Sequence, residues 1–189
     1  MALSRPAPRQ HIHTRTIKCE GFQRDDELWD IEATIVDTKT YSFENYDRGG
    51  IASGEPIHHM KVRITIDDEM EVLEAQAETI QSPYSICELG APPVSELKGL
   101  KIGPGWRRAV GEVLGRTKGC THLRDMIMGP LAQTAYQTII PMRRRKNPNK
   151  QPDKKPSVIG TCVAWDDAGP IVKQTWPQYF TGDTENGGN

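Results

Sequence analysis

The residues with the clearest chemical potential lie in the segment Gly119-Cys120-Thr121-His122. A thiol and an imidazole stand two positions apart there, just before apolar residues that recur at mostly four-residue spacing, as in an amphipathic helix. Those apolar residues are Leu123, Ile127, Leu131, Ala135 and Ile139. We therefore predict that a helix begins at the Cys-Thr-His step, where free backbone N–H groups and the helix dipole favour negative charge.

This helix end would suit two kinds of chemistry. A thiolate of Cys120 would have a depressed pKa there, and His122 would tend to stay neutral as a base or a ligand. The alternative is structural: Thr121 caps the helix, while Cys120 and His122 only pack. The motif by itself leaves both interpretations open.

Further polar residues fall in or beside the expected strands. Lys39 stands between two threonines, and on the concave side of a curved sheet its pKa would fall. His58 follows Gly-Glu-Pro-Ile and precedes an alternating apolar strand. Together with His122 and Cys120, these residues form the catalytic set that we predict, an acid–base set suited to carbon chemistry, which also includes Tyr41.

Other residues would hold a substrate beside that set. Arginine binds carboxylates and phenolates well, and aromatic rings form walls for planar molecules. The expected pocket lies between the concave sheet face and the helix that begins at Thr121. The substrate-binding residues that we predict are Arg48, Arg63, Trp29, Trp106 and Thr121, with Phe43 as a further wall.

A metal site is the alternative. Three cysteines and a histidine make a Cys₃His donor set, which suits zinc or an iron–sulfur cluster. Their spacing lacks the tight CxxC pair of most structural zinc sites, but scattered ligands also occur. The four ligands would be Cys87, Cys120, His122 and Cys162.

Composition limits the class of protein. The chain has 189 residues and a net charge of −1, so it is long enough for one domain with a real core and has no global field for nucleic acid. No 18-residue apolar run and no signal-like start are present, so we expect no membrane span. Four widely spaced cysteines without a secretion signal favour reduced thiols and a cytoplasmic protein.

Charge is unevenly distributed along the chain. Residues 20–78 hold sixteen acidic and five basic residues, whereas residues 141–156 hold seven basic residues and one acidic residue. The basic segment contains four prolines and no apolar periodicity, so we expect a solvated linker. It has no aromatic residue to stack on bases, which makes an arm that contacts another subunit of a homo-oligomer a better interpretation than a nucleic-acid arm.

The patterning predicts an α+β fold with a single domain over residues 1–189. Alternating apolar residues over 11–81 indicate a meander of four antiparallel strands in a curved sheet. Residues 84–140 form the helical part, with about three helices on one sheet face. After the linker at 141–156, residues 157–180 are expected to form a C-terminal hairpin.

Several segments, taken in order, resemble a bacterial family known only as a domain of unknown function. The resemblance spans nearly the whole chain. Two departures are His59, where the family has an acidic residue, and a long basic insert at 143–155. The matching segments include Leu3-Ser4-Arg5-Pro6, Trp29-Asp30-Ile31-Glu32, Gly54-Glu55-Pro56-Ile57-His58, Ile102-Gly103-Pro104-Gly105-Trp106 and Gly119-Cys120-Thr121-His122-Leu123.

The resemblance implies a link to the breakdown of aromatic compounds. Since no nucleotide, flavin or haem motif is visible, we expect a cofactor-independent lyase or isomerase that acts on a small aromatic molecule. Release of formaldehyde from a lignin-derived compound by a retro-aldol-like step is one example. The alternatives are the metal-binding scaffold and a non-catalytic binding or assembly module.

Overall fold

The structure is a computed structural model that describes residues 2–147 and 154–182. Contacts divide the chain into two compact units, Met1–Lys146 and Asn147–Asn189, where we had expected one domain. The first unit contains the sheet and most of the helices, and the described part of the second contains short helices only.

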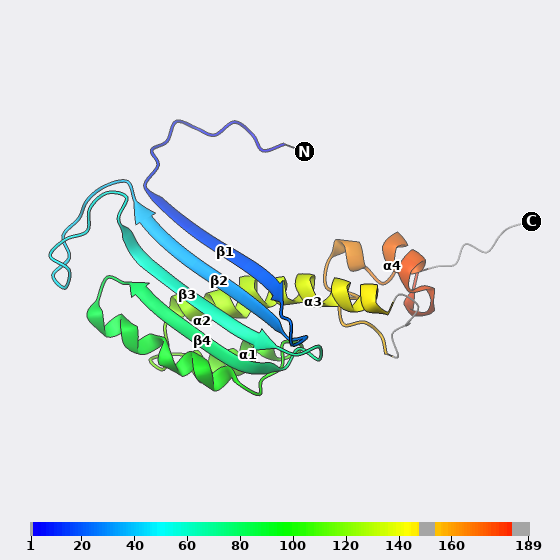
Figure 1. The fold of residues 1–189 in the computed structure, drawn as a ribbon. Coiled ribbons are helices and arrows are strands. Elements are labelled where there is room, and N and C mark those ends of the chain that lie inside the picture. Colours follow the sequence, from blue (N-terminus) through cyan, green and yellow to red (C-terminus); the bar gives the residue numbers. More distant parts are fainter. Residues whose placement is uncertain (1, 148–153, 183–189) are drawn as a thin grey trace, which may run out of the picture. The chain divides into compact units, whose positions relative to one another are not determined.

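The first unit is built on a four-stranded antiparallel sheet with the strand order β1-β2-β3-β4 (Figure 1). This confirms the predicted α+β fold with a meander of four antiparallel strands, and the sheet is not closed. Every strand pairs with its neighbours in sequence, so the connections are simple hairpins. The strands are β1 (His13–Gln23), β2 (Trp29–Lys39), β3 (Pro56–Ile66) and β4 (Val72–Gln81).

Alternation along β2 explains how the sheet acquires a buried face. Its odd-numbered residues are buried and its even-numbered residues are partly exposed over most of the strand. Because successive side chains of a strand point to opposite faces, the odd-numbered row faces the core. That row is Trp29, Ile31, Ala33, Ile35 and Asp37, which is apolar except at its last position.

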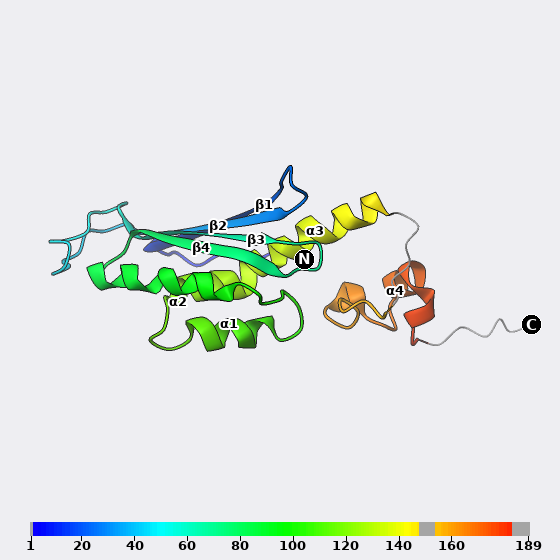
Figure 2. The same cartoon turned by 60° about the horizontal axis from the view of Figure 1, so that its bottom comes forward.

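The helices of the first unit cover one face of the sheet (Figure 2). One helix begins where we predicted it, because α2 starts at Thr121. Helix α1 spans Trp106–Leu114. Pro130 sits in a wider turn over Ile127–Leu131, so α2 continues into α3 through a local irregularity. Two 3₁₀ helices, η1 (Ser85–Gly90) and η2 (Pro92–Leu97), precede α1 in the chain. Helix α2 spans Thr121–Met126, and helix α3 spans Ala132–Lys146.

The start of the predicted linker is wrong, because α3 runs to Lys146 instead of ending before Pro141. Acidic and carbonyl groups at the strand turns bind the basic end of this helix. Arg143 donates to the Asp68 carbonyl over 2.8 Å, and Lys146 lies 3.8 Å from the Glu27 carboxylate. Residues 148–153 of the predicted linker lie outside the described residues.

The predicted C-terminal hairpin is also wrong. Residues 163–179 form η4 (Val163–Trp165), α4 (Pro170–Thr175) and η5 (Pro177–Tyr179). Pro170 follows Gly169 and takes the first helical position, where its missing N–H costs nothing and its fixed φ starts a helix. A small apolar cluster around Val172 and Trp176 holds this second unit together.

Candidate functional site

A row of three polar residues crosses the helix-facing side of the sheet at one end. The strand register places Arg15 of β1 opposite Asp37 of β2, and Asp37 opposite His58 of β3. The pairing between β2 and β3 shifts by one residue directly after Asp37, which is the kind of irregularity that often re-aims a side chain near a functional site. The register therefore assembles this row from three strands.

Asp37 is the centre of the row and is only 1% exposed. Arg15 donates to both of its oxygens, from Nε to Oδ1 and from Nη2 to Oδ2, each over 2.7 Å. His58 Nδ1 lies 3.0 Å from Oδ2, and His13 Nε2 lies 3.4 Å from Oδ1. A buried carboxylate is costly unless it is paired, and these partners supply the compensation.

His122 reaches the same place from the helical layer. Cys120 precedes α2 with an extended backbone and marks the end of the loop, so Thr121 begins the helix and His122 follows. The His122 ring lies against the His58 ring, with 3.9 Å between ring centroids and an interplanar angle of 35°. Two imidazoles and a buried carboxylate thus share one corner of the fold.

The ionisation of this group follows from burial and charge. Burial would raise the pKa of Asp37, but hydrogen bonds and charges from Arg15 and His58 outweigh it and hold the pKa below its usual range. Burial lowers the pKa of His58, and the nearby charge of Arg15 lowers it further. Asp37 raises it, but by less than the total lowering. Burial and the neighbouring His58 likewise lower the pKa of His122. At neutral pH the carboxylate is ionised and both imidazoles are neutral.

These charge states determine the tautomer of His58. An ionised carboxylate can only accept hydrogen bonds, so Nδ1 of His58 must carry the hydrogen that it shares with Asp37. The free lone pair of the imidazole is then on Nε2. This carboxylate–imidazole arrangement orients a general base or a metal ligand.

Cys120 contacts the group through sulfur. Its Sγ lies 3.7 Å from His122 Nδ1 and 3.7 Å from Met60 Sδ, and the side chain is partly buried. If the thiol donates to Nδ1, Nε2 of His122 carries the ring hydrogen and becomes a donor. The thiol has a single hydrogen, and the Met60 sulfur competes with His122 for it.

Asp37, His58 and His122 also fit a metal ion by distance. One ligand atom from each lies within 4.8 Å of the others, and this is the one such group of three or more in the described residues. In the first unit, Cys87, Cys120 and His122 of the predicted Cys₃His set form no such group, and Cys162 belongs to the second unit. The geometry favours a two-histidine, one-carboxylate donor set over the cysteine set.

A family model for proteins of unknown function, DUF2889, matches residues 13–137. The chain belongs to the DUF2889 family. The matched DUF2889 region begins at the first residue of β1 and ends within α3, so it contains the whole sheet and every residue of the polar row. The second unit lies outside it.

No curated protein and no solved structure matches the chain. Among the described residues, no helix combines the length and apolar character needed to cross a bilayer.

Four of the predicted substrate-binding residues have other roles within the DUF2889 region. Arg63 pairs with Glu32 and Gln76 on the sheet face that points away from the helices. Arg48 pairs with Glu55 and donates to the carbonyls of Pro56 and Ser82. Trp29 and Trp106 are core residues whose indole N–H groups donate to Asp68 and to the Ile127 carbonyl.

Lys39, Tyr41 and Thr121 lie near the polar row in sequence but make other contacts. Lys39 Nζ lies 5.2 Å from the centre of the Tyr41 ring, and Tyr41 packs against Phe43 at 6.1 Å between ring centroids. Thr121 is exposed and is the first residue of α2, so the N-cap position that we had considered for it belongs to Cys120. Of the predicted catalytic set, the structure brings together His58, His122 and Cys120.

Sequence reasoning missed Asp37 and Arg15. The signal for Asp37 was present, because it occupies the next position of the buried row after Trp29, Ile31, Ala33 and Ile35. A carboxylate on an apolar row must find partners, which marks it as structurally or chemically special. Arg15 carried no comparable signal, since its role depends on the register between β1 and β2.

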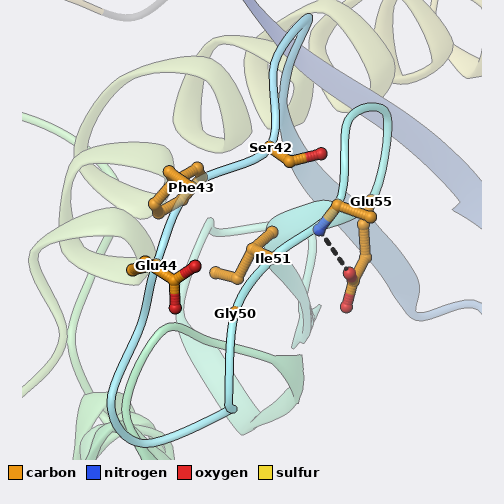
Figure 3. Close-up of a pocket in the computed structure, with 7 residues that line it drawn as sticks. Ser42, Phe43, Glu44, Gly50, Ile51 and Glu55 are labelled. Carbon is orange, nitrogen blue, oxygen red and sulfur yellow. Dashed lines mark hydrogen bonds between the residues drawn. The ribbon is translucent and has the colours of Figure 1, made fainter.

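Two hollows of the described residues are lined by no residue of the polar row, and neither is the pocket that we expected beside Thr121. The first has a volume of about 490 Å³ and is formed by the loop that joins β2 to β3 (Figure 3). Phe43 and Ile51 provide its apolar walls and Glu44 and Glu55 its acidic ones. The second lies at the turn between β1 and β2, around Arg24.

Proposed function

We propose that this protein is a cofactor-independent acid–base enzyme, of lyase or isomerase type, that acts on a small aromatic compound. The observation that carries the proposal is the hydrogen bond between buried Asp37 and His58 Nδ1, with the His122 ring stacked beside it. Such a pair has little reason to exist in a purely structural sheet, because an apolar residue would fill the position of Asp37 at lower cost.

His58 is the better base of the two histidines. Its Nε2 lone pair is available at neutral pH because the lowered pKa keeps the ring neutral. When the ring takes up a proton, the imidazolium that forms is stabilised by the Asp37 carboxylate at 3.0 Å. His122 has no such carboxylate contact among the described residues, and its Nδ1 faces the Cys120 sulfur.

His122 and Arg15 would stabilise negative charge. A donor on His122 Nε2 and the guanidinium of Arg15 supply positive potential where charge develops in a transition state. Arg15 already uses two N–H groups on Asp37, so it acts mainly through that carboxylate. His122 is therefore the group that we assign to the developing anion.

Formaldehyde release illustrates the reaction class. His58 would take the hydroxyl proton of a primary alcohol, and the bond between the alcohol carbon and its neighbour would break. The carbonyl of formaldehyde forms, and the electron pair of the broken bond remains on the aromatic fragment as a carbanion or phenolate beside His122. The imidazolium then returns the proton to that fragment, so the base is regenerated and no redox partner is needed.

Support for an aromatic substrate comes from two sources. The family resemblance described above implies aromatic-compound breakdown, and the Tyr41–Phe43 pair presents rings just beyond the end of β2. Phe43 also lines the hollow of the following loop. These rings could stack on a planar substrate, because offset and tilted aromatic contacts are favourable.

The test compares two adjacent histidines. His59 pairs with Val36 on the other sheet face, so His59→Ala is a matched control for His58→Ala. With a panel of diaryl compounds that carry a primary alcohol, we expect the purified parent protein and His59→Ala to release formaldehyde. His58→Ala should lose about 10²- to 10⁴-fold in turnover. Equal turnover of the two variants, or no release from any compound, would contradict the proposal.

A metal centre is the second candidate, favoured by the 4.8 Å grouping of Asp37, His58 and His122. Zinc or ferrous iron would suit two imidazoles and a carboxylate. The bidentate Arg15 contact weighs against it, since a divalent cation would have to compete with the guanidinium for the same two oxygens. Elemental analysis discriminates the two candidates: stoichiometric metal that is lost in His122→Ala but kept in Cys162→Ser would establish the metal site.

A further inference from the structure

Strand β1 has an open outer edge. It is the first strand of the sheet, it runs for 11 residues, and it pairs with β2 without any shift in register. Among residues 2–147 and 154–182, no segment pairs with its other side. A long, regular edge strand is a template for another strand unless it is protected.

The backbone groups on this edge can be assigned. The Thr40 N–H donates to the Ile12 carbonyl over 3.2 Å, which makes these two residues a hydrogen-bonded pair. Hydrogen bonding alternates along an antiparallel ladder, so the even-numbered residues of β1 bond to β2. The odd-numbered residues from His13 to Gln23 therefore direct their N–H and C=O groups outwards.

We propose that a second copy of this chain pairs with this edge, antiparallel, about a two-fold axis at Cys19. Lys18 and Glu20 form an ion pair over 2.8 Å within each chain. In the proposed register Lys18 also lies opposite Glu20 of the second copy, and the reverse pair forms by symmetry. A shift by one ladder step to either side would place Lys18 against itself or Glu20 against itself. Opposite charges across a ladder stabilise it and like charges destabilise it, so charge selects this register.

The position of α3 fits the same arrangement. Thr134 of α3 lies beside Cys19, a methyl group on Gly21 would clash with Thr138, and Lys146 lies close to Glu27. Helix α3 thus covers the second half of β1 only. In an antiparallel pair about Cys19, the two α3 helices underlie opposite halves of the paired strands and do not compete for space.

The half of β1 before Cys19 supplies the apolar contact. Ile17 is 40% exposed on the helix-facing side of this half. In the proposed register it lies opposite Gly21 of the second copy, beside that copy's Thr138. Arg15 lies opposite Gln23 of the second copy, so the interface borders the Asp37 cluster without depending on its chemistry.

Sedimentation velocity of the full chain tests the proposal with three charge variants. We expect the parent to be a dimer. Lys18→Glu and Glu20→Lys each replace two attractive pairs with two repulsive ones and should raise the dissociation constant at least about tenfold. The double variant Lys18→Glu/Glu20→Lys restores both pairs with the signs exchanged and should dimerise within about threefold of the parent.

Ile17→Pro gives an independent test. Proline removes an outward N–H and leaves the ladder to β2 intact, so this variant should be monomeric with an unchanged circular dichroism spectrum. If it fails to fold, the charge variants decide. A parent that stays monomeric at about 100 μM, or a dimer that is indifferent to the charge variants, would overturn the proposal.

Discussion

The two ends of the buried row on β2 are equally inaccessible and chemically opposite. Trp29 begins the row and Asp37 ends it, each with 1% exposure, about 26 Å apart at the rise of an extended strand. Trp29 packs in the apolar core and donates one hydrogen bond to Asp68 over 2.8 Å. Asp37 instead gathers Arg15, His13 and His58 around its carboxylate.

The difference shows that burial alone does not mark a functional residue. A buried tryptophan stabilises the fold through its apolar area, whereas a buried carboxylate is tolerated only when cationic and donor groups compensate its lost hydration. The end of the row at Trp29 therefore serves stability. At the Asp37 end, the fold instead holds an ionised carboxylate beside two neutral imidazoles.

The largest expected effect follows from neutralising Asp37. Asp37→Asn keeps the shape of the side chain but removes the charge that stabilises the His58 imidazolium and fixes its tautomer. We expect turnover to fall by about 10²- to 10⁴-fold. Since Asp37 opposes the lowering of the His58 pKa, the acid limb of any residual pH–rate profile should move to lower pH. A variant with parental turnover would remove Asp37 from the mechanism.

Removing the partner of Asp37 should cost stability. Arg15→Met leaves the carboxylate buried without its bidentate donor, and we expect the free energy of unfolding to fall by about 3 kcal/mol. The double variant Arg15→Met/Asp37→Leu removes both charges and should recover most of that loss. Urea denaturation of the two variants measures the difference. A single variant as stable as the parent would show that Arg15 does not stabilise Asp37.

The histidines make stability depend on pH in a defined direction. The pKa values of His58 and His122 are lower in the folded chain than in the unfolded chain. The folded protein therefore loses stability through these two residues as pH falls below about 6.5. The pKa of Asp37 is also lower in the folded chain, but its protonation reduces the stability of the folded protein only below about pH 4.

Replacing one histidine should therefore flatten the upper part of this curve. His122→Asn is expected to reduce the slope of unfolding free energy against pH, between about pH 6.5 and 5, by up to about 1 kcal/mol per pH unit. His59→Asn, on the other sheet face, provides the control. Identical slopes for the parent and the His122 variant would show that His122 does not titrate in this range.

The smallest effect is expected at the opposite end of the row. Asp68→Ala removes the acceptor of the Trp29 N–H, and the free energy of unfolding should fall by about 1 kcal/mol. Formaldehyde release should stay within about twofold of the parent, because the change lies at the far end of β2. A large loss of turnover would show that the two ends of the strand are coupled.

Local pattern was sufficient for most of the fold. Alternation along Trp29–Lys39 and Pro56–Ile66 predicted the strands, and four-residue spacing after His122 predicted the helix that presents it. The prediction of a C-terminal hairpin was wrong because Pro170 favours the start of a helix, which a search for alternating apolar residues does not detect. His58 and His122 could be singled out from residue type and context. Arg63 could also have been excluded, since it lies between Val62 and Ile64 of the alternating apolar row and so faces away from the core.

Sequence by itself determined the residue types, the strand and helix positions and the short list of histidines. Only the tertiary structure decided that Arg15, Asp37 and His58 share one cross-strand row and that α2 delivers His122 to its end. These residues are far apart along the chain, and a slip of one residue would turn a whole strand's side chains to the other face. The packing of the apolar row against the helices sets the register, and the register assembles the site.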